Sequence, residues 1–417
     1  MASSCNILNL PVEVLALIFK ELSSIKDKLN LAYAHPILGK AFAFEAGDTY
    51  KKIDFEERPI REWSQILVLC GSSVSRISKR TVSQTVVVTK LASKYCPNLE
   101  EFFIPVRRNF WNHISPLLLT LQNLNWVGFT NDFQMVNLVD TLLKLPKLNN
   151  LQVLGFCRGD LERLKELVNL EELTILNKNE DPIDIYKICS PMKKLNELEV
   201  KFGFIRIPEE IGGDQLWPKL DLLRIGYGMF YTQLPYLPSL KFLTIDNTAA
   251  HMKLNNIFGT TVTKYAETLE SLRFCSETLR DIDLQEAATI SKLRALKRLE
   301  CQLEDNFYID HYITNLNQLE ELSLQNSSQI TNCGILILMH RCKKLRKLDV
   351  FGCRLINNDL IMPAVAILCI NGVQPDNPVV LTVDRNFGSV HKSLCADVLV
   401  VQGHSSFAFF DLLSLLS

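Results

Sequence analysis

A short leucine pattern returns along most of the chain and limits the folds that the sequence can adopt. The pattern is Leu-x-x-Leu-x-apolar, with Phe in place of the second Leu in its first copy. It begins at residues 99, 121, 148, 170, 195, 220, 240, 269, 296, 319 and 345. Successive starts are 20 to 29 residues apart, a spacing typical of arrays of repeated structural units. A single unit cannot bury its own apolar side, so neighbouring units have to stack.

Each repeat is expected to contain one short strand and one returning helix. The leucines of the pattern point inward and the residues between them point outward, as alternation in a strand requires. The residues that lead to the next strand are numerous enough for a helix. The sequence therefore predicts an α/β horseshoe, with strands on its concave side and helices on its convex side.

The repeat array is expected to span residues 51 to 370. Weaker units are expected around Ile53 and Ile77, and one more strand near Leu381, where the regular period has already failed. Residues 371 to 417 are interpreted as a C-terminal cap or tail, whose Phe407, Phe409 and Phe410 are candidate exposed anchors.

The outward positions of the strands make up the expected concave face, which is neither uniformly charged nor uniformly apolar. Such a face suits a protein epitope of mixed polarity better than nucleic acid or lipid. Ser323 and Asp349 are also expected to point outward, and reversing the charge of Arg273 and Arg298 is expected to leave the fold intact. The candidate target-binding residues are Glu172, Glu197, Glu199, Arg224, Phe242, Arg273, Arg298 and Lys347.

Residues 5 to 50 lack the repeat and are expected to form three short helices. Pro11 falls in the first turn of the first helix, which carries Val14, Leu15, Ile18, Phe19 and Leu22 at intervals of three and four. A second helix is expected from residue 24 and a third around residues 36 to 44. A unit of this size has more apolar surface than it can hide within itself, so we expect it to bind a partner.

The opening LPVEVLALIF resembles the F-box signature L-P-x-E-(apolar)-x-x-x-I-F, and Leu29 falls where the second F-box helix has a leucine. The third helix differs, with Ala34-His35-Pro36 and Phe42 where the family usually has Val-Cys followed by Trp. An F-box followed by leucine-rich repeats resembles the substrate receptors of SCF ubiquitin ligases, and Cys353 in LRKLDVFGC resembles the cysteine-containing repeat subclass. The resemblance implies binding to the Skp-type adaptor of a cullin complex through Leu10, Pro11, Val14, Ile18, Phe19, Leu22 and Leu29.

Composition argues against several other classes of protein. Lys plus Arg (45) nearly balances Asp plus Glu (46), so the chain lacks the basic excess that nucleic-acid binding normally needs. No apolar run approaches the length of a membrane span, and the N-terminus lacks the basic start of a secretion signal. The twelve cysteines contain no CxxC pair and are expected to be reduced and mostly buried. These features predict a cytoplasmic and/or nuclear protein.

No motif for catalysis is found in the sequence. It contains no Walker A, HExxH or GxSxG motif, and the isolated Gly226-Tyr227-Gly228 is too short for a nucleotide loop. Cys333, His340, Cys342 and Cys353 are close in sequence, but Cys342 occupies a repeat position, so we expect no metal site. Neither catalytic residues nor a cofactor is expected.

The resulting hypothesis is a noncatalytic adaptor that brings an unidentified protein substrate to an SCF ubiquitin ligase for degradation. The alternative is a leucine-rich repeat scaffold for protein interactions that does not act in ubiquitylation.

Overall fold

The computed structural model of the chain describes two compact units, Met1–Lys178 and Asn179–Ser417. The described residues are 7–131, 137–155, 158–176, 182–208, 210–246, 253–275, 282–303, 305–384 and 397–403.

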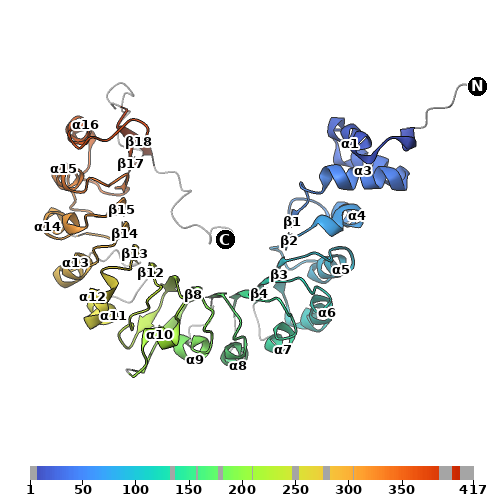
Figure 1. Cartoon of the computed structure of the whole chain (residues 1–417), viewed down its shortest axis with the longest axis horizontal. Helices are drawn as coiled ribbons and strands as arrows, with labels where there is room; N and C mark the ends of the chain where they lie inside the picture. Colours follow the sequence, from blue (N-terminus) through green and yellow to red (C-terminus); the bar gives the residue numbers. More distant parts are fainter. Residues whose placement is uncertain are drawn as a thin grey trace, which may run out of the picture. The chain divides into compact units, whose positions relative to one another are not determined.

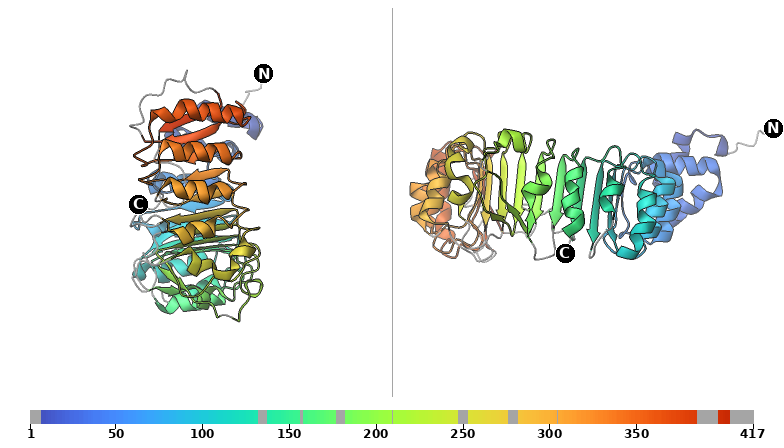
Figure 2. Two further views of the ribbon diagram at one scale, coloured as in Figure 1. Left: turned by 90° about the vertical axis from the view of Figure 1, so that its left-hand side faces the viewer. Right: turned by 90° about the horizontal axis from the view of Figure 1, so that it is seen from below.

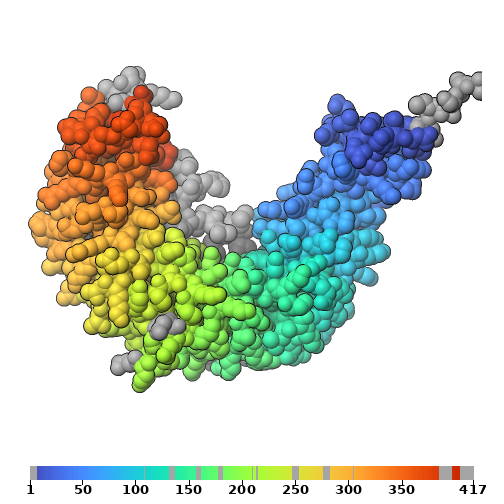
Figure 3. All heavy atoms as spheres, viewed as in Figure 1, coloured from blue at the N-terminus to red at the C-terminus, as the bar shows by residue number. Residues whose placement is uncertain are grey.

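The first unit begins with three helices that share a core. After the 3₁₀ turn η1 (Ile7–Asn9) they are α1 (Val12–Glu21), α2 (Ile25–Ala34) and α3 (Pro36–Ala46), as predicted. Phe19 of α1 and Phe42 of α3 are fully buried, with ring centroids 5.5 Å apart. The helix α3 packs against the first helix of the repeats, and Figure 3 shows the N-terminal helices in blue directly against the next segment of this unit.

Six parallel strands follow in the first unit, each beside the one before it in sequence (Figure 1). They are β1 (Lys52–Asp54), β2 (Arg76–Ser78), β3 (Glu101–Val106), β4 (Trp126–Asn131), β5 (Asn150–Leu154) and β6 (Glu172–Leu176). The returning segments contain α4 (Ile60–Cys70), η2 (Gly71–Ser73), α5 (Thr85–Tyr95), α6 (Arg108–Leu118), α7 (Leu138–Leu142), α8 (Arg158–Arg163) and η3 (Leu164–Glu166). The weak repeats predicted around Ile53 and Ile77 are therefore confirmed as β1 and β2.

The second unit continues the same arrangement with nine parallel strands in sequence order. They are β8 (Glu197–Lys201), β10 (Leu222–Gly226), β12 (Phe242–Asp246), β13 (Ser271–Cys275), β14 (Arg298–Glu300), β15 (Glu321–Ser323), β16 (Lys347–Asp349), β17 (Val379–Val383) and β18 (Leu399–Gly403). A smaller parallel sheet contains β7 (Ile183–Asp184), β9 (Gly203–Ile205) and β11 (Met229–Phe230).

Helices lie on one side of the main strands of the second unit, and those of its orange to red part stack next to one another in Figure 2. They are α9 (Ile185–Cys189), α10 (Gly213–Leu216), α11 (Leu254–Phe258), α12 (Val262–Tyr265), α13 (Leu284–Ile290), α14 (Asn306–His311), α15 (Asn332–Arg341) and α16 (Ile361–Ile370). The 3₁₀ turns of this unit are η4 (Gly259–Thr261), η5 (Ile313–Asn315) and η6 (Asn358–Leu360). Within the described part of the chain, no helix combines the length and apolar character of a membrane span.

A row of buried leucines in register holds the second unit together. These leucines pair in sequence from strand to strand and none is more than 2% exposed. They are Leu198, Leu223, Leu243, Leu272, Leu299, Leu322, Leu348 and Leu381. Because each leucine contacts its counterparts in the adjacent repeats, burial depends on stacking, as the sequence pattern predicted. The chain has a leucine-rich repeat fold.

The parallel strands continue beyond residue 370. The strand predicted near Leu381 is confirmed as β17, which pairs with β16, and β18 follows beside it. The predicted domain boundaries, one after residue 50 and one after residue 370, stay predictions. The structure divides into compact units at a different place, between residues 178 and 179. Phe407, Phe409 and Phe410 lie outside the described residues.

The described cysteines are free thiols, and most of them are buried. Cys333 and Cys369 are exposed and Cys275 is half-buried. Burial raises the pKa of the Cys70 thiol and of the Cys96 thiol to about 12, so both are protonated at neutral pH. The buried cysteines are Cys70, Cys96, Cys189, Cys301, Cys342 and Cys353.

Candidate protein-binding surfaces

Helix α1 is apolar on two faces, and only one of them is buried. Leu15 and Phe19 are fully buried against the other helices of the first unit. On another face, Leu10, Val14 and Leu17 are 38%, 43% and 55% exposed. A helix that covers a small core normally shows polar residues to solvent, so this exposed group is unusual. We call Leu10, Val14 and Leu17 the α1 stripe.

The structure divides the predicted adaptor-binding residues between surface and core. Leu10, Pro11 and Val14 are exposed, while Ile18 and Leu22 are half-buried. Phe19 and Leu29 are 0% and 4% exposed, so their assignment to the binding surface is corrected: they are core residues of α1 and α2, which both pack against α3.

Sequence reasoning missed Leu17 as a member of this surface. A helical period of 3.6 places Val14 and Leu17 on a different face from Leu15, Phe19 and Leu22. The apolar residues of α1 therefore form two faces and not the single face that was predicted.

The second candidate surface is the strand face of the second unit, the side of its strands that carries the outward residues of the repeats. Parallel pairing places these residues in rows that run across the strands. The first row contains Glu197, Leu222, Phe242, Ser271, Arg298, Glu321, Lys347 and Val380. The second row contains Glu199, Arg224, Thr244, Arg273, Glu300, Ser323, Asp349, Thr382 and Gln402.

Seven of the eight predicted target-binding residues lie in these two rows. They are Glu197, Glu199, Arg224, Phe242, Arg273, Arg298 and Lys347. The eighth, Glu172, lies on β6 of the first unit, in register with Asn150 of β5. The predicted strand register is therefore confirmed, whereas target binding by these residues stays a prediction.

Ion pairs connect neighbouring repeats along both rows. Arg224 Nη1 lies 2.9 Å from Glu199 Oε2 in the second row. In the first row, Glu321 Oε1 lies 2.8 Å from Lys347 Nζ, and Glu321 Oε2 lies 3.5 Å from Arg298 Nε. Each of these cations has a carboxylate partner, so the strand face is not an unpaired basic surface.

Arg273 is held between two carboxylates. Its guanidinium lies 2.7 Å from Asp246 and 3.3 Å from Glu300. Burial alone would lower the pKa of Arg273, but Glu300 and Asp246 outweigh it and raise this pKa. Burial also raises the pKa of the Glu300 carboxyl, with Arg273 acting in the opposite direction and Asp246 and Asp349 adding to the increase.

Ser323 and Asp349 differ from the expectation that they point into solvent. They are only 6% and 5% exposed. Ser323 has the longer side chains of Glu300 and Asp349 in register on either side, whereas Asp349 lies between Ser323 and Thr382 and accepts hydrogen bonds from Gln325 and the Phe351 amide. Strands lie about 4.8 Å apart, so a short side chain between long neighbours loses contact with water. Outward orientation in a repeat therefore does not ensure exposure.

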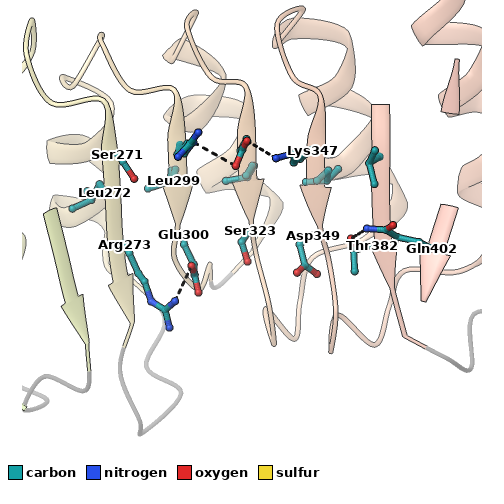
Figure 4. A pocket seen from close by; sticks show the side chains of 15 residues that line it. Ser271, Leu272, Arg273, Leu299, Glu300, Ser323, Lys347, Asp349, Thr382 and Gln402 are labelled. Atoms are coloured by element: carbon teal, nitrogen blue, oxygen red, sulfur yellow. Dashed lines mark hydrogen bonds and ion pairs between the residues drawn. The ribbon is translucent and has the colours of Figure 1, made fainter. Parts of the chain in front are cut away.

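A small hollow lies over the last strands of this face (Figure 4). Arg273, Glu300, Ser323 and Asp349 line one side of it. Its volume is about 50 Å³, whereas pockets for small organic ligands typically have about 300–1,000 Å³. The hollow can admit one side-chain head group or a few waters, but not a cofactor.

The cysteine and histidine residues considered for a metal site have other positions in the structure. Cys333 and His340 are exposed on α15, and Cys342 is buried after its end. The Cys353 thiol is buried and donates to the Leu324 carbonyl at 3.0 Å. Among the described residues, no group of three or more His, Cys, Asp or Glu side chains is arranged to hold a metal ion.

The ion pairs change the expected outcome of charge reversal. Arg273→Glu places a third carboxylate beside Asp246 and Glu300 in a largely buried position, so we expect it to lower the free energy of unfolding by roughly 2–4 kcal/mol. Arg298→Glu changes a half-exposed side chain and should cost less than about 1 kcal/mol. Urea unfolding of the two single variants checks this, and equal stabilities would contradict the role assigned to Arg273.

Comparisons with known proteins give matches only among solved structures. No family model matches the chain, and no curated protein matches it. An internalin (InlF) from Listeria monocytogenes aligns over 75% of this chain and 78% of its own, with 17% identity and a TM-score of 0.40. A chain of the yeast Rad7 and Elc1 complex aligns over 93% of this chain and 92% of its own, with 14% identity and a TM-score of 0.46. With both TM-scores below 0.5, the fold assignment rests on the strand register and the buried leucines.

Proposed function

We propose that this protein is a noncatalytic substrate-recognition adaptor of an SCF ubiquitin ligase. In this proposal residues 5 to 50 are an F-box that binds a Skp-type adaptor, and through it a cullin. The leucine-rich repeats bind the protein that is to be ubiquitylated. The observation that carries the proposal is the α1 stripe at the start of a leucine-rich repeat chain.

The α1 stripe has the properties of an interface centre. Val14 and Leu17 are three residues apart on α1, whose opposite face is fixed by Phe19, and the exposed Leu10 lies just before the helix. Because the backbone is held by a packed core, binding would cost little conformational entropy. Burying three aliphatic side chains in a partner yields a few kcal/mol, at about 25 cal/mol for each Å² of apolar surface removed from water.

The strand face supports a protein target rather than nucleic acid or a small ligand. Its cations Arg224, Arg298 and Lys347 are already paired with carboxylates, so they are poorly placed to replace counterions on a phosphate backbone. The hollow beside them is too small for a small-molecule ligand. A broad surface of mixed polarity remains, as in non-obligate protein interfaces.

The proposed mechanism is proximity. Holding a target on the repeats while α1 to α3 are bound to the ligase raises the effective concentration of target lysines near the ubiquitin-charged enzyme. The chain itself forms no covalent intermediate in this scheme. The proposal assigns the protein to the cytoplasm and/or nucleus, where thiols such as Cys70 and Cys96 stay reduced.

One observation favours a second function, that of a repeat scaffold outside ubiquitylation. The N-terminal helices pack against α4, and the Tyr33 hydroxyl donates to the Gln65 carbonyl at 3.0 Å. In this alternative α1 to α3 serve only to cover the first repeat, since terminal repeats need a cap. The α1 stripe would then have no partner.

Co-expression of the full chain with a Skp-type adaptor and a cullin distinguishes the two functions. The expected result is a complex that survives gel filtration and transfers ubiquitin to a protein bound by the repeats. A chain that folds but elutes without the adaptor would overturn the ligase function and favour the scaffold.

A further inference from the structure

Three neighbouring side chains in the second row of the strand face carry hydrogen-bond acceptors. Glu300, Ser323 and Asp349 are neighbours in register on β14, β15 and β16. Glu300 shares one cation, Arg273, with Asp246. Figure 4 shows the three side chains next to one another along the hollow.

Asp349 is a buried carboxylate that forms no ion pair with the described residues, because the cations that line the same hollow, Arg273, Arg298 and Lys347, pair with other carboxylates. It accepts hydrogen bonds from Gln325 Nε2 at 2.7 Å and from the Phe351 amide at 3.0 Å. Both donors are neutral, so the charge of a side chain that is 5% exposed is not balanced by them. A buried carboxylate in this state favours the approach of a positive group.

A further polar atom that lines the hollow, Ser323 Oγ, has no hydrogen-bond partner within the described part of the chain, and its residue is 6% exposed. Most buried polar groups in folded proteins are paired, so an unpaired hydroxyl in register with the Asp349 carboxylate indicates a site for a missing donor.

We propose that Glu300, Ser323 and Asp349 form a recognition site for a basic side chain, lysine or arginine, of the bound target protein. This inference rests on the proposed function in one respect, that the strand face is where the target binds. The head group would enter the hollow, donate to Ser323 Oγ and lie between the two carboxylates.

Size and charge agree with this occupant. A volume of about 50 Å³ matches an ammonium or guanidinium group that displaces one or two waters. A lysine ammonium offers three donors and an arginine guanidinium offers five, with no acceptor. An acidic or neutral side chain would leave the Asp349 charge unbalanced. The site therefore selects for a cation.

The test uses the full chain and small cations as probes, so it does not require a known target. Binding of n-propylguanidinium and n-butylammonium is measured by saturation-transfer NMR, with n-propylurea as the neutral analogue of the first. We expect a dissociation constant on the order of 1–10 mM for at least one cation, and binding of the urea at least about tenfold weaker.

Two variants separate a binding role from a structural role. Asp349→Asn keeps an acceptor for the Phe351 amide but removes the charge, and should weaken cation binding about tenfold. Ser323→Ala removes an unpaired hydroxyl, so it should weaken cation binding about threefold while leaving the melting temperature unchanged or higher. The control is Glu267→Gln, an exposed acid of the second unit outside the hollow, which should bind like wild type.

The outcomes separate this inference from the ligase proposal. Equal binding of n-propylguanidinium and n-propylurea, or wild-type affinity in Asp349→Asn, would overturn the cation site. Adaptor co-purification of the same variants is measured in parallel and should be unchanged. Failure of wild type to bind the adaptor would overturn the ligase function alone, because the probes bind without it.

Discussion

Replacing Val14 and Leu17 together by arginine is expected to abolish co-purification with the Skp-type adaptor while leaving the fold intact. Both side chains are about half exposed, so charges there meet water in the free protein. In a complex the same charges would be buried in an apolar contact without partners, at a cost of several kcal/mol. The measurement is the amount of adaptor recovered per mole of purified chain, together with circular dichroism and thermal unfolding.

The matched control for this double variant is Val68→Arg. Val68 is 47% exposed on α4 of the same unit but lies outside the α1 stripe, so adaptor recovery should equal that of wild type. Phe19→Ala is not a suitable test, because the Phe19 ring is buried against Phe42 and its loss should destabilise the unit by about 3–5 kcal/mol. Wild-type recovery of adaptor by a folded Val14→Arg, Leu17→Arg chain would refute the assignment of the α1 stripe.

Leu322→Ala and Leu348→Ala should each lower the free energy of unfolding by about 2–5 kcal/mol. Each leucine is almost fully buried and pairs in register with a leucine on either side, so neighbouring repeats cannot easily fill the cavity. Urea unfolding followed by circular dichroism measures the change, read as a shift of the midpoint at constant slope.

The control is Lys347→Ala, one residue before Leu348 on the same strand. The Lys347 side chain is 53% exposed and pairs with Glu321, an exposed arrangement worth less than about 1 kcal/mol. If Lys347→Ala destabilised the protein as much as Leu348→Ala, the inward and outward assignment of these strands would be wrong.

The position and register of the strands could be predicted from the sequence alone. Ten of the eleven predicted copies of the leucine pattern begin two residues before a parallel strand, and Leu299, Leu322 and Leu348 pair as the spacing implies. The copy predicted from residue 121 is three residues out of register, because β4 pairs Trp126 with Glu101 and its pattern therefore begins at Leu124. The reason is that each repeat buries the same side through the same short pattern. Strand, face and neighbour are therefore all encoded within about 25 residues. The three N-terminal helices were also predictable, because Pro11 and the apolar spacing of α1 are local signals.

Exposure within the candidate surfaces could not be predicted in the same way. Leu17 and Phe19 are both apolar residues of α1, yet one is 55% exposed and the other fully buried, because α3 packs against only one side of the helix. Ser323 and Asp349 occupy outward positions, yet both are buried.

For the charged residues of the strand face, too, orientation could be predicted from the sequence, whereas their ion-pair partners could not. The sequence identified Arg273 as an outward residue, but its partners Asp246 and Glu300 come from two other strands, 27 residues away on either side. Local alternation sets which residues form the strands and which way their side chains point, so these properties can be inferred from the amino-acid order. Which outward side chains are covered, paired or left without a partner depends instead on the size and charge of neighbours that stacking brings together.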